Sequence, residues 1–407
     1  MTLIECFTES HIDNLAACLL LRPETMIIVG SEEEMPEYVS RYQKVLKNRG
    51  YPTQIRMYDV QGKDFGDICA VFKRLVCQES ECVIDLTGGE EPVIMAVGAV
   101  LAGLDEARRA RIHVQRFDFD RDAALDCVHG NCAITGKPIT LSVEELVTIH
   151  GGSLHPQAYQ LPADCSRKDL EPLWRIVAEN PKHWNYAVML LKEFESRSAS
   201  KTEIRLSLEQ LQRSIHNYSE KAPVVLELLE KLEKRGIIEN TSYNETLQYT
   251  YRNAMFRYCL QKAGNVLEIK TLLEGRALRD NGAPYFRDCR TSVTIDWDGV
   301  LHAPAEHVSD TRNEVDVVLM HGTTPLFISC KNGNIEEEEL YKLYTVAHRF
   351  GGPYAKKMLI ATEMDPKKPT ANRSFMQRAW DMDIFLVSDA ADLSKEEWRE
   401  AFRNAML

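Results

Sequence analysis

The stretch NEVDVVLMHGTTPLFISCK, residues 313–331, holds two apolar runs on either side of a polar turn. Runs rich in valine, leucine and isoleucine are typical of β-strands, and Gly322 and Pro325 between them are typical of a turn. The pattern therefore predicts a β-hairpin within an α/β domain. Pairing of the two strands would place Asp316 alongside residues 329–331.

Polar residues interrupt both predicted strands near their open ends. Because side chains alternate along a strand, Glu314 and Asp316 share one face. By the same rule, Ser329 and Lys331 share one face of the partner strand. Carboxylate oxygens and the backbone carbonyl of Cys330 are hard ligands suited to Mg²⁺ or Mn²⁺. Such a cation would polarise a phosphoryl oxygen and activate a water, and the lysine would stabilise the negative charge that develops.

A surface hairpin with solvent-facing polar residues is the alternative interpretation. It explains Glu314 easily. It explains Asp316 and Lys331 less well, because each is enclosed by apolar neighbours, as residues of central strands are.

The combination of Asp316 with Ser329-Cys330-Lys331 resembles the core of the PD-(D/E)xK, or restriction-endonuclease-like, nucleases. In that superfamily a helix carrying a glutamate precedes the aspartate strand, and Glu268 fits that place. A later helix often carries a Gln-xxx-Tyr pair, which Glu337 and Tyr341 resemble with an acid substituted. The resemblance implies a divalent-metal-dependent endonuclease with Asp316, Glu268, Glu314 and the Cys330 carbonyl around the cation.

Ser329 departs from this pattern, because the superfamily usually has an acidic residue two positions before the lysine. Glu268, Glu314 or a water is expected to complete the coordination, or the site is expected to prefer Mn²⁺. A domain that binds nucleic acid without cutting it is the alternative, since losing an oxygen ligand weakens a hard-cation site.

The first 120 residues alternate strand-like and helix-like segments. Strands are expected at residues 3–7, 25–29, 54–58, 82–86 and 113–119, with helices at residues 12–21, 34–48, 66–77 and 93–104. Short apolar runs separated by helices predict a parallel sheet covered on both faces, as in a Rossmann-like domain.

In an open parallel sheet, ligands bind where strands end. The residues expected there are Thr8, Ser10, His11, Gly30, Ser31, Thr87, Gly88, Gly89 and Glu90. Thr8 or Ser10 could also cap the helix that follows the first strand. The glycines after the fourth strand would let backbone N–H groups approach a phosphate, although a tight turn needs glycine too. A dinucleotide cofactor is a poorer interpretation, because no G-x-G-x-x-G follows the first strand.

The Thr87-Gly88-Gly89 turn, set in such a sheet, resembles the CRISPR-associated Rossmann fold (CARF). Together with the C-terminal hairpin, the chain resembles the cyclic-oligoadenylate-activated nucleases of type III CRISPR systems. The resemblance implies a homodimer, cyclic tetra-adenylate as activator, and cleavage of single-stranded RNA or DNA in antiviral defence. Many CARF domains have a lysine or asparagine where Glu90 stands.

The expected division is a CARF domain over residues 1–150, a winged-helix-like linker over 168–252 and a nuclease domain over 253–407. A long amphipathic helix is predicted at residues 253–274. A ligand-responsive winged-helix regulator of DNA, with a degenerate nuclease domain, is the alternative function. The basic residues of the linker are nearly balanced by acids, which weakens that alternative.

Bulk composition agrees with a globular protein of two or three domains. The 407 residues are 44% hydrophobic and 27% charged, and the formal net charge of −12 argues against coating nucleic acid through a broad basic surface. No apolar run is long enough for a membrane span, and an apparent strand at the N-terminus leaves no room for a signal peptide. The protein is therefore expected in the cytoplasm, with its eleven cysteines as free thiols.

Overall fold

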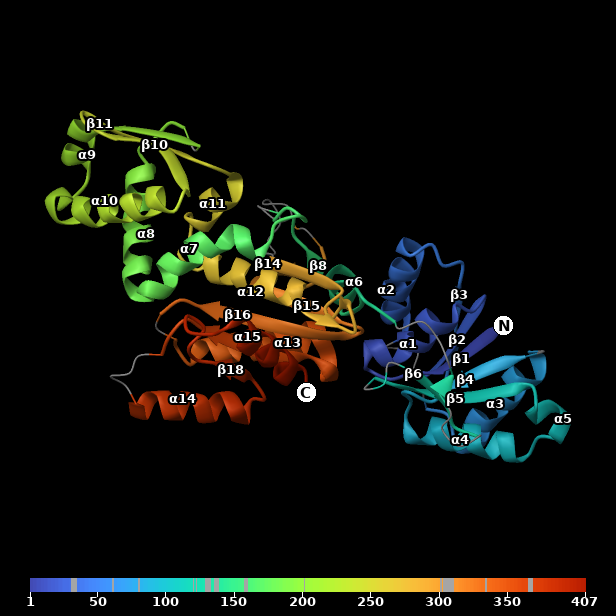
Figure 1. Ribbon diagram of the computed structural model, residues 1–407. Coiled ribbons are helices and arrows are strands. Elements are labelled where there is room, and N and C mark those ends of the chain that lie inside the picture. Colours follow the sequence, from blue (N-terminus) through green and yellow to red (C-terminus); the bar gives the residue numbers. More distant parts are fainter. Residues whose placement is uncertain are drawn as a thin grey trace.

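The computed structural model describes residues 1–30, 35–60, 62–79, 81–119, 121, 123–128, 133–134, 139–156, 160–200, 202–300, 302, 311–333, 335–364 and 369–407. Figure 1 shows the N-terminal sheet at one end of the molecule, a helix-rich part at the other, and a second large sheet between them. This is a mixed α/β architecture, as predicted. None of the helices in the described ranges is long and apolar enough to span a membrane.

The N-terminal part alternates strands and helices. Its elements are β1 (Thr2–Cys6), α1 (His11–Leu21), β2 (Thr25–Gly30), α2 (Met35–Asn48), β3 (Gln54–Asp59), α3 (Phe65–Gln78), β4 (Cys82–Asp85), α4 (Glu91–Ala102), α5 (Glu106–Arg109), β5 (Ile112–Asp118), β6 (Ala123–Asp126) and β7 (Ala133–Ile134). The strand order is β3-β2-β1-β4-β5-β6-β7. The first five strands pair in parallel, and β6 and β7 add an antiparallel edge that the sequence patterns did not predict.

Both faces of this sheet are buried at its central strands β1, β2 and β4, as predicted, whereas the edge strand β3 is largely exposed. Leu3 and Phe7 point into a cluster with α1 and α2, whereas Ile4 and Cys6 point into a cluster with α3 and α4. Alternate residues of one strand thus serve opposite faces, so every position of β1 is buried.

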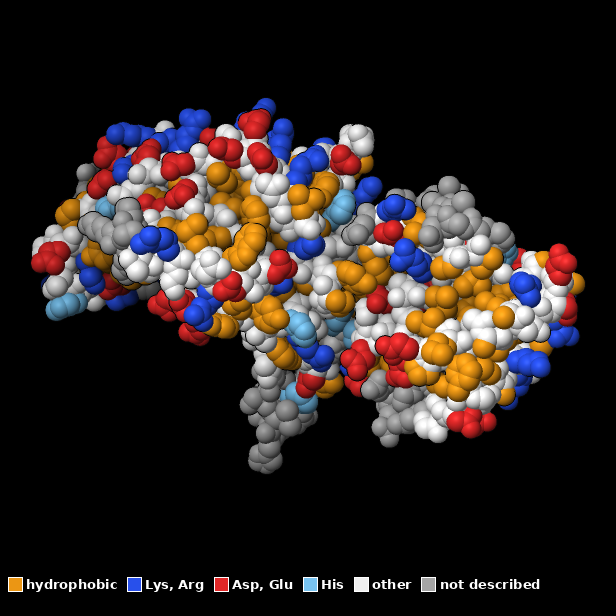
Figure 2. Space-filling model, turned by 90° about the horizontal axis from the view of Figure 1, so that it is seen from below, with side chains coloured by type: hydrophobic (Ala, Val, Ile, Leu, Met, Phe, Trp, Pro, Cys, Tyr) orange, Lys and Arg blue, Asp and Glu red, His pale blue; other side chains and the backbone are white. Residues whose placement is uncertain are grey.

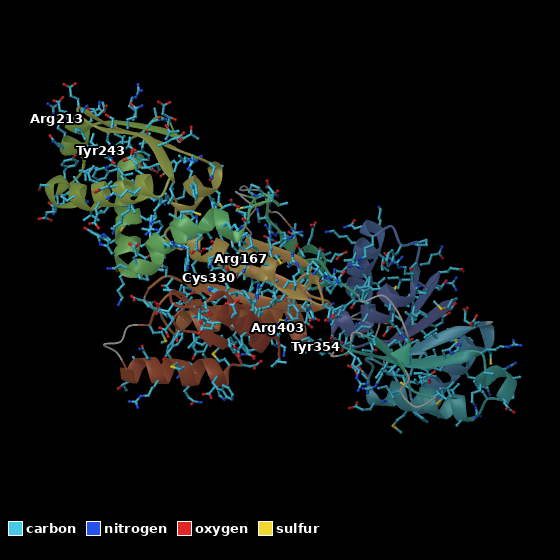
Figure 3. All side chains as sticks on the ribbon, in the orientation of Figure 1. Arg167, Arg213, Tyr243, Cys330, Tyr354 and Arg403 are labelled. Atoms are coloured by element: carbon cyan, nitrogen blue, oxygen red, sulfur yellow. The ribbon has the colours of Figure 1, made fainter. Side chains whose placement is uncertain are left out.

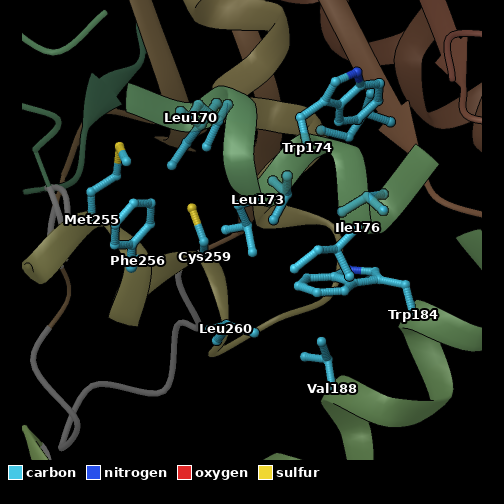
Figure 4. Packing of buried hydrophobic residues seen from close by; sticks show 14 of the residues in the cluster. Leu170, Leu173, Trp174, Ile176, Trp184, Val188, Met255, Phe256, Cys259 and Leu260 are labelled. Carbon is cyan, nitrogen blue, oxygen red and sulfur yellow. The ribbon is translucent and has the colours of Figure 1, made fainter. Parts of the chain in front are cut away.

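The middle of the chain is helix-rich and includes a small sheet. Its elements are α6 (Val143–Ile149), β8 (Ser153–Leu154), α7 (Arg167–Glu179), α8 (Pro181–Glu195), β9 (Glu203–Ser207), α9 (Leu208–Ser214), α10 (Tyr218–Lys234), β10 (Ile238–Tyr243) and β11 (Thr246–Tyr251). The strands β10 and β11 form the expected antiparallel pair, and β9 joins them at the free edge of β11. Figure 4 shows Trp174 and Trp184 packed among the leucines of α7 beside Phe256 and Cys259.

The C-terminal part is built on a sheet with the order β18-β17-β16-β15-β14-β8. Its elements are α11 (Ala254–Cys259), α12 (Asn265–Ala277), β12 (Arg279–Asp280), β13 (Ala283–Pro284), β14 (Asp288–Asp296), β15 (Arg312–His321), β16 (Thr324–Lys331), α13 (Glu338–Gly351), the 3-10 turn η1 (Gly352–Tyr354), β17 (Lys356–Ala361), α14 (Pro369–Asp381), β18 (Phe385–Val387) and α15 (Lys395–Met406). Helices α12 and α15 cover one face of this sheet, and α6, α13 and α14 cover the other. The predicted hairpin is confirmed as β15 and β16.

The prediction of one long helix at residues 253–274 is wrong, because the chain breaks between α11 and α12. The carbonyl of Tyr258 accepts a hydrogen bond from the Asn265 side chain at 2.7 Å. The carbonyl of Ala263 accepts one from the indole of Trp184 at 3.0 Å. These carbonyls bond to side chains instead of continuing one helix. The second helix is buried on all sides, so it lacks the amphipathic pattern on which the prediction depended.

Helix α6 joins the two large sheets. It packs against α2 on the N-terminal side and against α13 and β14 on the C-terminal side. The short strand β8 that follows it pairs with β14. Residues 139–154 therefore belong as much to the C-terminal sheet as to the N-terminal one.

Candidate active site and ligand loops

The β15–β16 hairpin opens beyond the pair Val317–Ile328, and Asp316 occupies the opening. The Asp316 carboxylate accepts a hydrogen bond from the backbone N–H of Cys330 at 2.7 Å, and the Ser329 hydroxyl lies 3.5 Å from the same oxygen. In an extended strand, the N–H and C=O of one residue point to the same side. The Cys330 carbonyl therefore faces the Asp316 side, as a shared cation site requires.

The backbone opposite Asp316 is strained. Thr291 and Val293 pair with β15 on either side of Ser292, and Ser292 itself has a φ of 49°, in the left-handed region. Its hydroxyl contacts a Glu268 oxygen at 3.2 Å and the Tyr258 hydroxyl at 2.8 Å. Ser292 thus fixes the buried carboxylate of α12 next to the opened hairpin.

Three carboxylates gather here, Glu314 and Asp316 from β15 and Glu268 from α12. Lys262, on the turn before α12, lies 3.7 Å from Glu268 and 3.7 Å from Glu314. Burial, followed by the negative charge of Asp316, raises the pKa of Glu268 to about 7, against the opposing charge of Lys262. Burial also raises the pKa of Asp316, although Lys331 and the Cys330 N–H oppose that shift. Buried like charges of this kind favour a bound cation.

Lys331 is held by a residue of the following helix. Its ammonium lies 2.7 Å from a carboxylate oxygen of Glu339, in the first turn of α13. The hydrogen bond and charge of Lys331 lower the pKa of Glu339 below its usual value, in spite of its partial burial. A cavity of about 80 Å³ is lined by both residues together with Asp316, Ser329 and Glu314.

The structure brings the predicted catalytic residues together and adds three others. At the opened hairpin lie Asp316, Lys331, Glu314, Ser329 and Glu268. Glu337, which resembles the glutamine of the superfamily pair, instead lies 3.6 Å from Arg378 of α14. Tyr341 also bonds to Arg378.

Lys262, Ser292 and Glu339 were not predicted. Lys262 belongs to a turn, and Ser292 belongs to an irregular position of a strand. Sequence periodicity indicates neither position. Glu339 had a signal in the acidic run 336–339, but periodicity does not select one member of that run.

The donors suit a divalent cation in chemistry but form a sparse set. Within the described ranges, no group of three or more His, Cys, Asp or Glu side chains is arranged to hold a metal ion. The Asp316 carboxylate is bonded by the Cys330 N–H, which places the Cys330 carbonyl on the same side of the strand. Hard oxygen donors of this kind match Mg²⁺ or Mn²⁺.

The predicted ligand loops of the N-terminal sheet contact one another closely. A Cβ on Gly88 would lie 2.4 Å from the Thr8 methyl, and a Cβ on Gly30 would lie 2.3 Å from Phe7. Gly89 has a φ of 106° and no space for a side chain against Cys6. The glycines therefore serve close packing between the loops after β1, β2 and β4.

The polar groups in these loops have different surroundings. The Thr87 hydroxyl accepts a hydrogen bond from the Phe117 N–H at 2.7 Å, and Glu90 is exposed before α4. Ser10 occupies the N-cap position of α1 without a side-chain cap, so the predicted capping is wrong. The Asn14 amide instead bonds both backbone groups of Thr8. Ser31 lies outside the described residues.

His11 is buried beneath the loop. Its ring stacks on Tyr38 at 4.4 Å between centroids and meets His150, at the end of α6, at 4.6 Å. Burial, and then the charges of neighbouring His150 and Arg41, lower the pKa of His11 to about 2. His11 is therefore neutral and sits where the N-terminal sheet meets α6.

A second group of buried acids lies under these loops. Glu5, Asp85 and Gln115 are register neighbours across β1, β4 and β5 and are almost fully buried. Asp85 accepts hydrogen bonds from Gln115 at 2.9 Å and from the Thr87 N–H at 2.8 Å. Neither oxygen of Glu5 has a hydrogen-bond partner among the described residues. Burial, followed by the charge of Asp85, raises the pKa of Glu5 well above its usual value.

Known structures resemble this chain over its whole length. Protein VC1899 from Vibrio cholerae has a TM-score of 0.71 and 16% sequence identity, covering 100% of this chain and 97% of its own. Can2 from Sulfobacillus thermosulfidooxidans, solved in complex with cyclic tetra-adenylate, has a TM-score of 0.65 and 16% identity, with the same coverage. No protein-family model matches the chain, and no curated protein matches it in sequence. At this identity the likeness shows a shared fold.

Proposed function

We propose that this chain is a cyclic-oligoadenylate-activated, divalent-metal-dependent nuclease that cuts single-stranded RNA or DNA in CRISPR-type antiviral defence. The observation that carries the proposal is the meeting of Asp316, Lys331 and Glu268 at the opened hairpin. That site stands in a chain whose full length shares the fold of Can2, which was solved with cyclic tetra-adenylate bound. In this proposal residues 1–150 form a CARF domain and residues 253–407 form a PD-(D/E)xK-like nuclease domain.

The loops after β1, β2 and β4 are the proposed site for the activator. They meet at the carboxyl ends of parallel strands, where α4 begins without a side-chain cap on its first turn. Thr8, Thr87 and the glycine backbone would contact the cyclic tetra-adenylate. His11 is buried, so it would respond to the ligand through the loop rather than touch it.

Exposed apolar side chains of the N-terminal part support the proposal of a homodimer. Ile94 and Met95 of α4 are exposed by 36% and 64%, and Met57 and Phe65 are exposed by 42% and 45%. Figure 2 shows orange apolar side chains gathered on the lobe that the N-terminal sheet forms. Pairing of two copies would cover apolar surface of this kind and present a two-fold groove to a cyclic ligand.

The residues at the hairpin divide the chemistry between them. Asp316 and the Cys330 carbonyl would hold the cation, with Glu268 as a further oxygen donor fixed by Ser292. When bound, the cation polarises the scissile phosphate and lowers the pKa of its water. Lys331 would donate to a phosphate oxygen and stabilise the charge that develops during attack.

Contacts between η1 and the N-terminal part would couple the ligand loops to this site. Tyr354 of η1 lies 4.4 Å from Phe119 of the N-terminal part, ring to ring, and its hydroxyl bonds the Asp13 carboxyl. Figure 3 shows Tyr354 on the side of the C-terminal part that faces the N-terminal sheet. A ligand that favours one arrangement of α1 would thereby shift the population of arrangements of α13.

The test is a cleavage assay with the full chain. Labelled single-stranded RNA, single-stranded DNA and duplex DNA are incubated with Mn²⁺ or Mg²⁺, with and without cyclic tetra-adenylate. Cleavage of single strands that needs both the metal and the ligand, and that Asp316→Ala abolishes, is expected. Duplex binding without cleavage under every condition would overturn the proposal and favour a regulator of DNA.

A further inference from the structure

The proposed cation site lacks one acid where related sites have one. Ser329 lies on the strand two residues before Lys331, and its hydroxyl reaches Asp316 only at 3.5 Å. A neutral hydroxyl is a much weaker ligand for Mg²⁺ or Mn²⁺ than a carboxylate. The cavity beside Ser329 therefore requires an acidic oxygen from another element.

Glu339 brings a carboxylate to the same cavity from α13. It lines that cavity with Asp316, Ser329 and Lys331. One of its oxygens bonds the Lys331 ammonium at 2.7 Å, and its side chain is only 23% exposed. Glu268 comes from the helix on one face of the sheet, and Glu339 comes from the helix on the other face.

The neighbouring glutamates do not reach this cavity. Glu338 is 67% exposed and pairs with Lys342 at 3.0 Å, and Glu337 pairs with Arg378. Only Glu339, among the acids of this run in the described chain, contacts Lys331. Its position on α13 therefore selects it from a charge run that is otherwise solvated.

Hydrogen bonds of the Asn332 side chain anchor the segment between β16 and α13. The Asn332 side chain accepts a hydrogen bond from the Thr362 hydroxyl at 2.7 Å and donates one to Asn185 at 2.8 Å. Gly333 follows with a φ of 104°, a conformation that favours glycine. Helix α13 packs against β16.

From these contacts we infer that Glu339 supplies the acidic oxygen ligand that Ser329 lacks. In this assignment the acidic ligand comes from helix α13 instead of from strand β16, which carries Lys331. Without a cation, the Glu339 carboxylate holds the lysine. The inference rests on the proposed function, since it names a further residue of the same cation site.

An acid swap between the two positions tests the inference in the full-length protein. The variants are Glu339→Gln, Ser329→Glu, the double variant with both changes, and Glu338→Gln as the matched control. Glutamine still accepts a hydrogen bond from Lys331, so a role confined to positioning that lysine predicts little change. Mn²⁺ affinity is measured by calorimetry, and single-strand cleavage is measured in parallel with cyclic tetra-adenylate present.

Glu339→Gln is expected to weaken Mn²⁺ binding at least about tenfold, and Glu338→Gln is expected to leave it unchanged. The double variant should recover the wild-type affinity to within about threefold, because a carboxylate has returned to the cavity. Unchanged Mn²⁺ affinity in Glu339→Gln would overturn the inference. So would a double variant that keeps the wild-type melting temperature but does not recover binding.

The two proposals fail in different ways. If the wild type binds Mn²⁺ and the swap behaves as expected, but no nucleic acid is cut, the ligand assignment stands and the nuclease function is rejected. If the wild type cuts and Glu339→Gln both binds Mn²⁺ and cuts equally well, the nuclease stands and the assignment of Glu339 is rejected.

Discussion

Both large sheets bury acidic side chains near the ends of central strands, but the two groups are balanced differently. At the C-terminal hairpin, Glu268 lies close to Lys262, and the charge of Lys331 acts on Asp316. Under the N-terminal loops, Asp85 is satisfied by N–H donors alone. Glu5 has no hydrogen-bond partner among the described residues.

This difference separates a site built for charge from one built to stay neutral. Carboxylates that lie near ammonium groups and backbone carbonyls can remain ionised and accept a cation. A carboxyl group with no partner, fully enclosed by protein, holds its proton instead. The two sites should therefore respond differently to mutation and to pH.

Removing the lysine should have the largest effect. Lys331→Ala leaves the charge that develops on the phosphate without its stabilising ammonium, so ligand-activated cleavage should fall about 10²–10³-fold. The melting temperature should hardly change, because the side chain is partly exposed. Cleavage retained within twofold in a gel assay would show that the hairpin is not the catalytic centre.

Adding a methyl group where the N-terminal loops touch should abolish activation and leave the metal site intact. The new methyl in Gly88→Ala would collide with Thr8, forcing the two loops apart at a cost of about 1–3 kcal/mol. Stimulation by cyclic tetra-adenylate should disappear while Mn²⁺ affinity stays at the wild-type level. Gly98→Ala, on α4 with open space around it, is the matched control.

The pH dependence should distinguish the two acid groups. The pKa of Glu268 is raised to about 7, so this carboxyl is protonated, and a poor ligand, at lower pH. Mn²⁺ affinity should therefore increase as the pH rises through about 7, and Glu268→Gln should flatten that increase. Calorimetry between pH 5.5 and 8.5 measures both curves, and an equally steep rise in the variant would contradict the assignment.

The neutral acid should give the smallest effect, visible only in stability. Because the pKa of Glu5 is raised in the folded state, the unfolded chain releases this proton first as the pH rises above about 4.5. Its contribution to stability is thus present at acidic pH and lost as the pH rises towards the folded-state pKa.

Glu5→Gln keeps the shape without the proton and should remove this loss. It should melt a few degrees above the wild type at neutral pH and close to it near pH 4. A variant that melts below the wild type at pH 8 would show that Glu5 is ionised and stabilised in the fold. Thermal melts across this pH range provide the measurement.

Periodicity predicted the large elements well. The five parallel strands and the hairpin were found within a residue or two of their true ends, because each is an apolar run bounded by turns. The break between α11 and α12 was missed, since it depends on the side chains of Trp184 and Asn265 bonding carbonyls of the turn. The bond from Trp184 comes from a distant part of the chain and leaves no local pattern.

The candidate site was predicted in part for the same reason. Asp316 and Lys331 lie just beyond the paired part of one hairpin, so a hairpin prediction places both at its open end. Glu339 and Lys262 reach the site from a helix and a turn whose positions are set by packing. Ser292 shows its role only through its left-handed φ.

Contacts at its two ends restrict the length of helix α13. Its first turn holds Lys331 through Glu339, and its far end leads to Tyr354 beside Phe119. Its 14 residues span about 20 Å, and each residue turns the helix by about 100°. One inserted residue would leave both ends helical yet rotate one anchor away from its partner. We therefore expect this helix to tolerate substitution on its exposed face but no change in length, unlike the loops around it.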